Sequence, residues 1–178
     1  MQVAISIIGK DRPGIISELT SVLSENGANI EDASMTLLQG HFAMIIVVEC
    51  ADDNLENIQN QLRNSDVLNG FTLEFSILDI QNSAKEIEVD KDSVHYVLHL
   101  SVKDTIGVVA NITKILGENF ANVIDCSTRI NKETGVFTLS LDVDIPVEKE
   151  SLIVEKVQSK SSEYDGDIVF LKIDYVDL

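Results

Sequence analysis

Two side chains and the backbone of one helix start could together bind a small zwitterion. The chain reads Asp11-Arg12-Pro13-Gly14 where a strand pattern changes to a helix pattern, and Asn29 follows that helix. A helix N-terminus offers unpaired N–H donors and a positive dipole to a carboxylate. An aspartate offers a counter-charge to an ammonium group, and an asparagine side chain both donates and accepts hydrogen bonds. These groups would suit a free α-amino acid.

The same junction also has a purely structural interpretation. Aspartate is a favoured N-cap because its carboxylate accepts the free N–H groups of the first helical turn. Proline is tolerated in that turn, where its missing N–H costs nothing. Gly14 would then only permit close packing, and for a single copy of the motif this capping interpretation is the commoner one.

An internal repeat favours binding over capping. Shifting the sequence by 93 residues lays Lys10–Ser34 over Lys103–Ser127 with 11 identities in 25 positions, which indicates a tandem duplication. Capping alone would accept Ser, Thr or Asn in place of the acid and would not require glycine. We expect the asparagine that opens the next strand to lie beside the strand-to-helix loop, in the same domain or across a domain interface. The residues that recur are Asp11/Asp104, Gly14/Gly107 and Asn29/Asn122.

Each copy has the same order of elements. Strands alternate or run apolar, helices show apolar residues at helical spacing, and Gly27 is a natural residue to close the first helix. The order βαββαβ predicts an α+β fold of two ferredoxin-like domains, each an antiparallel sheet with helices on one face. The expected domains are 1–80 and 93–178, joined by a linker at 81–92. The expected strands are 2–9, 29–38, 41–49, 71–80, 94–102, 122–130, 136–143 and 168–176; the expected helices start near 15, 55, 107 and 147, the last two ending at 119 and 161.

Composition narrows the class of protein. There are 13 Lys and Arg against 30 Asp and Glu, a net charge of −17, which disfavours direct binding to nucleic acid. This charge suits a cation, an ammonium-bearing ligand or a basic protein partner, and it equally suits solubility. No apolar run is long enough for a membrane span, and no secretory signal is visible. Two cysteines, Cys50 and Cys126, predict buried thiols in a reducing cytoplasm.

The strand at 42–48 is apolar on both faces, which predicts that its sheet is covered on both sides. Since helices cover one face only, the second domain or another subunit would cover the other, and we favour a homodimer.

Catalytic and metal sites have little support in the sequence. His95 and His99 on one strand would lie roughly 13 Å apart, too far to bind one metal ion. Cys126 has no adjacent base, and no hydrolase or nucleotide-binding motif is present. We therefore expect no enzyme activity, no metal and no cofactor.

The stretches GKDRPGIISELTSVLSENGANIEDASM and GHFAMIIVVE resemble the ACT-domain family of regulatory amino-acid-binding modules, in particular the glycine cleavage system transcriptional repressors. The resemblance covers both copies. It implies a ligand held between two domains by the first strand-to-helix loop and by the asparagine that opens the second strand. In the second copy Thr105-Ile106 replaces Arg-Pro, and Phe120 replaces Gly27, so its site departs from the pattern. The residues implicated are Asp11, Arg12, Pro13, Gly14, Ile15, Asn29 and Ile30, with Asp104, Gly107, Val108 and Asn122 by repeat.

The resemblance implies a non-catalytic cytoplasmic regulator that binds glycine or another small amino acid and modulates a protein partner, such as a transcription activator. Two alternatives stay open: an interaction module that has lost ligand binding, and the regulatory subunit of an amino-acid biosynthetic enzyme on another chain.

Overall fold

The computed structural model describes residues 1–79 and 92–173. The chain divides into two compact units, Met1–Ile87 and Glu88–Leu178, each with its own core. Of the predicted linker 81–92, only Asp92 is among the described residues. The domain boundaries at 80 and 93 therefore stay a prediction.

The first domain folds in the predicted order. Its antiparallel sheet has the strand order β2-β3-β1-β4, so β1 lies in the interior and β2 at one edge. Its elements are β1 (Gln2–Lys10), α1 (Ile15–Glu25), β2 (Asn29–Leu38), β3 (His41–Glu49), the 3₁₀ turn η1 (Asp52–Asn54), α2 (Leu55–Asn64) and β4 (Thr72–Leu78).

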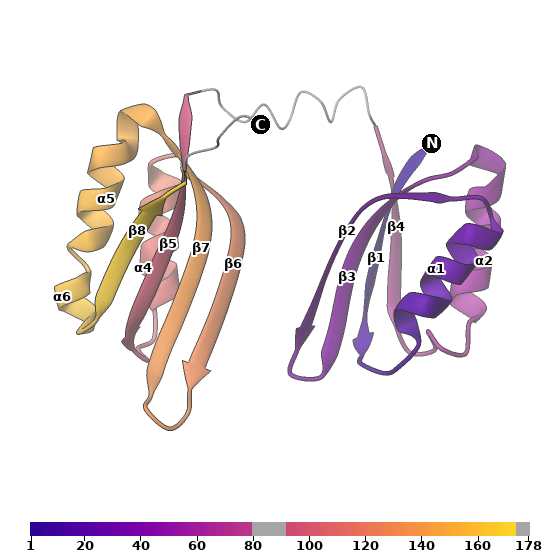
Figure 1. Ribbon diagram of the computed structural model, residues 1–178, viewed down its shortest axis with the longest axis horizontal. Coiled ribbons are helices and arrows are strands. Elements are labelled where there is room, and N and C mark those ends of the chain that lie inside the picture. Colours follow the sequence, from indigo (N-terminus) through magenta and orange to yellow (C-terminus); the bar gives the residue numbers. More distant parts are fainter. Residues whose placement is uncertain (80–91, 174–178) are drawn as a thin grey trace. The chain divides into compact units, whose positions relative to one another are not determined.

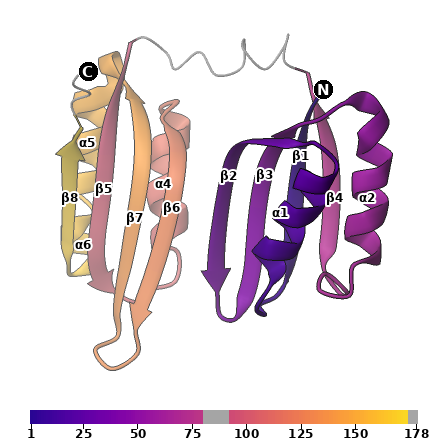
Figure 2. The ribbon, with the colours of Figure 1, turned by 45° about the vertical axis from the view of Figure 1, so that its right-hand side comes forward.

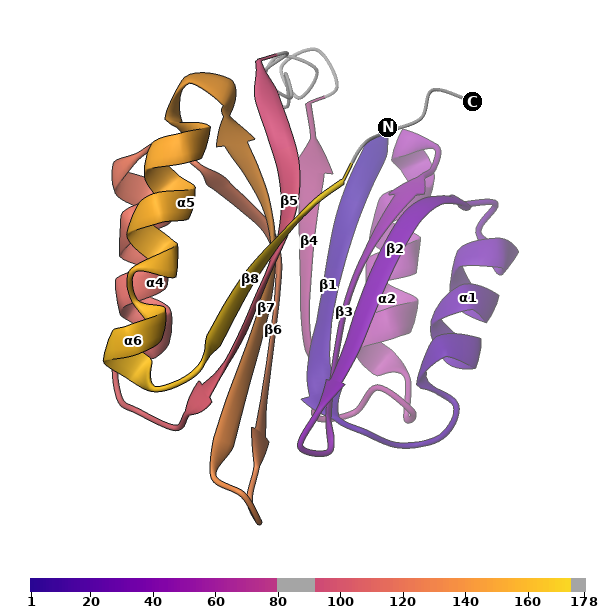
Figure 3. The same cartoon turned by 60° about the vertical axis from the view of Figure 1, so that its left-hand side comes forward.

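The second domain repeats this plan with the strand order β6-β7-β5-β8. Figures 1 and 3 show α1 and α2 on one face of the first sheet, and the helices of the second domain on one face of the second sheet. Two tandem α+β domains of ferredoxin-like topology are thereby confirmed. The elements are β5 (Ser93–Lys103), α4 (Val108–Glu118), β6 (Asn122–Asn131), β7 (Val136–Pro146), η2 (Val147–Lys149), α5 (Glu150–Gln158), α6 (Ser161–Tyr164) and β8 (Asp167–Lys172).

Apolar alternation explains why the sheets bury one face. Val3, Ile5 and Ile7 of β1 point toward the helices and are fully buried, while the residues between them face the other side. From α1, four apolar residues at helical spacing complete this core: Ile15, Leu19, Val22 and Leu23.

The predicted helix 147–161 is wrong in its continuity. It consists of a 3₁₀ turn and two helices, and the break follows α5, where the Lys160 N–H bonds three residues back to Val157 O at 3.0 Å. The strand predicted at 136–143 is too short, because Pro146 still pairs with Ser93. Of the strand predicted at 168–176, residues 174–176 lie outside the described residues, as does residue 80 of the strand predicted at 71–80.

The edge strand β2 is exposed along its whole length, because α1 and α2 cover the interior strands and leave the edge open. Figure 2 shows β2 at this edge of the first sheet. On the helix-free face, Ile8 and Ile45 are also exposed. A covering domain or subunit for that face stays a prediction.

Candidate functional site

The strand-to-helix loop occupies the same place in both domains. After β1, the Asp11 N–H donates to the carbonyl of Gly40 at 2.9 Å, which ties the loop to the β2–β3 hairpin. After β5, the Asp104 N–H donates to the carbonyl of Gly135 at 3.0 Å. The duplication has thus preserved this hydrogen bond together with the Asp and the Gly of the loop, while the two residues between them differ.

Glycine persists at this helix start because the backbone is left-handed there. Gly14 has φ +95° and Gly107 has φ +94°, a region that costs a residue with a Cβ about 1–2 kcal/mol. Gly14 is itself the N-cap of α1, and no side chain caps the helix. The interpretation of Asp11 as an N-cap is therefore wrong, since the helix begins at Ile15, three residues later than a capping aspartate requires.

Because no side chain caps α1, its first donors remain available. The first helical hydrogen bond runs from the Glu18 N–H to the carbonyl of Gly14 at 2.9 Å. Among the described residues, no acceptor bonds the N–H groups of Ile15, Ile16 or Ser17. Three unpaired donors at the positive end of a helix dipole can bind a carboxylate.

A cavity of about 220 Å³, here called the Met35 cavity, opens beside these donors. Sequence reasoning missed Met35 and Phe42, which come from β2 and β3. β1 and β2 both run antiparallel to β3, so their carboxyl ends lie at the same end of the sheet. This topology could have predicted that Met35 lies near the loop after β1. The cavity is lined by Asp11, Arg12, Gly14, Ile15, Ile16, Ser17, Met35 and Phe42.

Arg12 is held in place and is not a freely solvated side chain. Its guanidinium donates to the carbonyl of Asn69 and lies 5.1 Å from the centre of the Phe71 ring. The ring in turn fills the space over Gly9, where a Cβ would lie 2.5 Å from it. Pro13 is exposed in the turn. A second cavity of about 360 Å³ lies here, lined by Lys10, Asp11, Arg12, Asn69, Gly70 and Phe71.

Asn29 lies at the other end of the sheet from the loop. Glu49 of β3 pairs with Asn29 of β2 on one side and with Gln2, at the start of β1, on the other. Lys10, which leads into the loop, pairs with His41 at the far end of β3. At about 3.3 Å per residue, the length of β1 separates the two ends by roughly 25 Å.

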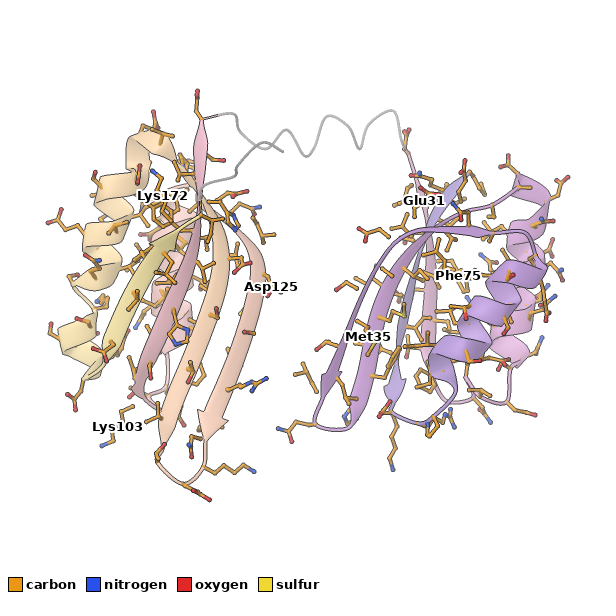
Figure 4. The ribbon with its side chains drawn as sticks, viewed as in Figure 1. Glu31, Met35, Phe75, Lys103, Asp125 and Lys172 are labelled. Atoms are coloured by element: carbon orange, nitrogen blue, oxygen red, sulfur yellow. The ribbon has the colours of Figure 1, made fainter. Side chains whose placement is uncertain are left out.

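The expected meeting of Asp11 and Asn29 within one domain is therefore wrong. Asn29 is exposed, and its Nδ2 donates to Glu31 Oε1 at 2.7 Å. Figure 4 labels Glu31 near the upper end of β2 and Met35 nearer its lower end. Ile30, beside Asn29, is likewise exposed. The two groups can act on one ligand only if two domains contribute them.

The second domain has a matching cavity of about 350 Å³, here called the Phe137 cavity. Ile106, which stands where Pro13 stands in the first copy, is fully exposed, and no arginine holds this loop. Asn122 pairs with Asp144 near the end of the sheet opposite this loop. The lining residues are Asp104, Thr105, Gly107, Val108, Val109, Ala110 and Phe137.

Within residues 1–79 and 92–173, no group of three or more His, Cys, Asp or Glu side chains is arranged to hold a metal ion. His95 Nδ1 lies 2.9 Å from Asp144 Oδ1. Burial raises the pKa of the Cys50 thiol, which disfavours a reactive thiolate. In the same described ranges, no helix has the length and apolar character needed to cross a membrane.

Comparison with known proteins identifies relatives of the first domain. A model of the ACT domain matches residues 1–76. A UPF0237 protein of Methanopyrus kandleri is 41% identical over 63 residues, which are 34% of this chain and 70% of that protein. Across three UPF0237 proteins the matched segment spans 52% to 70% of the relative's length.

Solved structures that match across both domains include two that each cover 97% of this chain. An unknown protein from Galdieria sulphuraria is 26% identical with a TM-score of 0.80, over 97% of this chain and 98% of that one. A protein provisionally described as a glycine cleavage system transcriptional repressor is 14% identical with a TM-score of 0.67, over the same shares. At this identity the second likeness shows the fold alone.

Proposed function

The chain is a tandem ACT-domain protein of the UPF0237 family, and on this premise we propose that it is a non-catalytic regulator that binds a small amino acid and transmits this signal to a protein partner. The ACT domain is a regulatory fold. The ligand and the partner are our proposal, and the observation that carries it is the uncapped start of α1 beside Asp11.

The groups around the Met35 cavity match the two charges of an amino acid. The N–H groups of Ile15, Ile16 and Ser17 would receive the α-carboxylate, whose charge the helix dipole favours. The Asp11 carboxylate, which caps nothing, would receive the ammonium group. The small volume of the cavity favours glycine or another amino acid with a short side chain.

A second copy of the chain would bring Asn29 to this cavity. β2 is an edge strand, so its outer N–H and C=O groups have no neighbouring strand in its own sheet. If two β2 strands pair antiparallel, the Asn29 end of one lies against the Leu38 end of the other. The Leu38 end adjoins the loop at Asp11, because Leu38 pairs with His41 and His41 with Lys10. The missing amide would then reach the ligand from the partner.

Exposed apolar side chains along this edge support such pairing. Ile16 of α1 and Met35 and Leu37 of β2 are all exposed on the helix-covered side of the sheet edge. Their burial would stabilise a homodimer by the hydrophobic effect. We propose a related site at Asp104, Gly107 and Val108, with Asn122 supplied by a partner domain; it differs in that the Val108 N–H donates to the carbonyl of Thr105 at 3.4 Å.

Regulation requires that the ligand bind two domain arrangements with different affinity, since a ligand that binds both equally shifts nothing. Because the ligand would lie at a domain interface, binding would favour the paired arrangement. The net charge of −17 favours a basic protein partner over DNA. A regulator of transcription in glycine or amino-acid metabolism is the partner class that we propose, by analogy with the repressor of similar fold.

Isothermal titration of the full chain, refolded to remove carried-over ligand, against each of the twenty amino acids tests this proposal. We expect binding of one small amino acid and its loss in Asp11→Asn. Asp104→Asn is the matched control, and it separates the first site from the second. If no amino acid binds, the chain is an interaction module without a ligand, and the proposal fails.

The role of the partner domain is tested with Asn29→Ala and Leu37→Glu. Asn29 is exposed and, within residues 1–79 and 92–173, its side chain bonds only Glu31, so its loss should weaken ligand binding with little change in stability. Leu37→Glu should shift the chain toward the monomer in sedimentation and weaken binding in parallel. A monomer that binds with full affinity would contradict the paired site.

A further inference from the structure

In each domain a buried asparagine caps the C-terminus of the first helix, Asn26 after α1 and Asn119 after α4. The hydrogen bonds of these two side chains differ. In the first domain, Asn26 Nδ2 donates to the carbonyl of Val22 at 2.8 Å and to Gln61 Oε1 at 3.2 Å. Its Oδ1 accepts from Asn57 Nδ2 at 2.6 Å, and its main-chain carbonyl accepts from Asn54 Nδ2 at 2.8 Å. Every polar group of Asn26 is thereby paired within the domain.

The second domain keeps the asparagine but lacks these partners. Asn119 is 7% exposed, and its Nδ2 donates to the carbonyl of Ile115 at 2.7 Å. Among the described residues, no donor bonds Asn119 Oδ1. Aligning η1 and α2 with η2 and α5 places Lys149, Leu152 and Lys156 where the first domain has Asn54, Asn57 and Gln61. In the described part of the chain no fully buried side-chain polar atom lacks a hydrogen-bond partner, so Asn119 Oδ1 is open to solvent and can accept a hydrogen bond from a ligand.

Asn119 lines a cavity of about 650 Å³, here called the Asn119 cavity. The cavity lies between the end of α4 and the junction of β7 with α5, at the end of the second sheet opposite the loop at Asp104. Figure 1 shows the β7–α5 junction at this upper end of the second sheet. The cavity is therefore separate from the site proposed for the amino acid.

Phe120, next to Asn119, also lines the cavity. Its backbone conformation and its exposure do not favour the stability of the domain. Its φ of +60° is left-handed, the conformation that Gly27 adopts at φ +64° in the first domain. A bulky residue rarely adopts this conformation, and Phe120 is 83% exposed, so its ring gains little from burial. Strain together with an exposed aromatic ring indicates a binding role.

The charges around the cavity favour a cation. The C-terminus of α4 contributes its negative dipole end, and the acidic residues Asp92 and Glu148 line the same cavity. Asp92 is fixed there by the Val147 N–H, which donates to its carbonyl at 2.7 Å. Among the described residues of the lining, Lys149 is the one cation, and its Nζ lies 4.0 Å from Glu148 Oε1, which partly neutralises it.

We propose that the Asn119 cavity binds the guanidinium group of an arginine side chain. The planar guanidinium can donate to Asn119 Oδ1 and to the Glu148 carboxylate while it stacks on the face of Phe120. The methylene groups of the arginine would contact the exposed side chain of Val147. A lysine ammonium suits the site less, because it is compact, strongly hydrated and cannot stack.

NMR titration of the ¹⁵N-labelled full chain with the blocked peptide N-acetyl-Gly-Arg-Gly-amide tests this proposal. Both ends of the peptide are blocked, so it has neither the α-ammonium nor the α-carboxylate that the proposed amino-acid site would bind. Failure of either proposal therefore leaves the other untouched. We expect shifts of the Asn119 side-chain amide and of the Phe120 N–H, with none at Asp11 to Gly14. The citrulline peptide is the neutral isosteric control and should bind at least tenfold more weakly. Equal binding of the citrulline peptide, or no shift at Asn119, overturns the proposal.

Two variants test the geometry without removing the buried asparagine. Phe120→Gly restores the first-domain residue and should weaken peptide binding by roughly threefold to thirtyfold, the range of a lost cation–π contact. Leu152→Asn restores a donor to Asn119 Oδ1 and should weaken binding by occupying that acceptor. Unchanged affinity in both variants contradicts the assignment. A parallel titration with free arginine identifies the source: tighter binding of the peptide indicates a protein partner, and tighter binding of free arginine indicates the amino acid, each in support of a guanidinium site.

Discussion

The guanidinium of Arg12 lies 5.1 Å from the centre of the Phe71 ring and donates to the neighbouring carbonyl of Asn69. These contacts tie the loop before α1 to the loop before β4. Gly9 permits them, because any larger residue there would displace the Phe71 ring. The arginine therefore helps to hold the loop that carries Asp11 and Gly14.

Arg12→Lys should destabilise the first domain by about 1 kcal/mol, because lysine cannot combine stacking with a directed hydrogen bond at this site. Hydrogen exchange of first-domain amides in the full chain measures the effect. Arg129→Lys is the matched control, since Arg129 is exposed and, among the described residues, makes no ring contact or side-chain hydrogen bond. Equal protection in both variants would show that the Arg12 contacts do not stabilise the loop.

Gly14→Ala should destabilise the first domain by about 1–2 kcal/mol, since alanine is strained at a positive φ. Space is not the cause, because the added Cβ would lie 3.8 Å from its nearest neighbour, Val67. Gly117→Ala is the control of opposite sign. Gly117 lies within α4 with open space around it, and alanine there should stabilise the second domain by about 0.5–1 kcal/mol. Calorimetric melting curves of both variants are the measurement, and a change of the same sign in both would contradict the assignment.

Phe120→Gly should leave the second domain as stable as before or stabilise it by up to about 1.5 kcal/mol. Relief of the left-handed strain contributes about 1–2 kcal/mol, and the larger entropy of glycine in the unfolded chain offsets about 0.5–1 kcal/mol of this. Gly27→Phe is the reciprocal change in the first domain and should destabilise it. Urea unfolding followed by domain-resolved NMR signals gives both values. A clear loss of stability in Phe120→Gly would mean that the ring serves the fold.

The hydrogen bond from Tyr96 and the nearby Lys172 lower the pKa of Glu150 below its usual value. Since the folded-state pKa lies below the unfolded one, this contribution is complete above the unfolded pKa, about 4.3, and is lost as the pH falls through the folded value. The stability difference between the chain and Glu150→Gln should therefore shrink from pH 7 to pH 3. Urea unfolding across this range measures it. A stability difference that stays constant for Glu150→Gln would contradict the assigned cause.

Local sequence patterns were enough to predict most of the fold. Gly27 to close α1, the turn at Gly40 and the alternation of Val3, Ile5 and Ile7 are all determined by neighbours in sequence, and β2 and β3 were predicted with their observed bounds. The helix from Val147 was predicted as continuous, because its apolar spacing does not reveal the break after Gln158. Element boundaries depend on hydrogen bonds that the pattern does not encode.

Only part of the candidate site could be predicted from the sequence. The recurrence of Asp11 and Gly14 pointed to the loop, and the left-handed backbone supplies the reason for the glycine. The contribution of Met35 and the position of Asn29 depend on strand register, which follows from pairing across the sheet. Asn29 follows α1 closely in sequence but lies far from the start of α1, since this helix carries the chain back to the other end of the sheet.

The sequence by itself determined the duplication, the βαββαβ order and the residues that recur, because these follow from periodicity and from comparison of the chain with itself. Tertiary structure decided that Asn29 and Asp11 lie at opposite ends of one sheet, that Arg12 stacks on Phe71, and that Asn119 lacks the donors that Asn26 has. These relationships join residues far apart in the chain. They are set by strand register and by packing between helix and sheet, which no local pattern specifies.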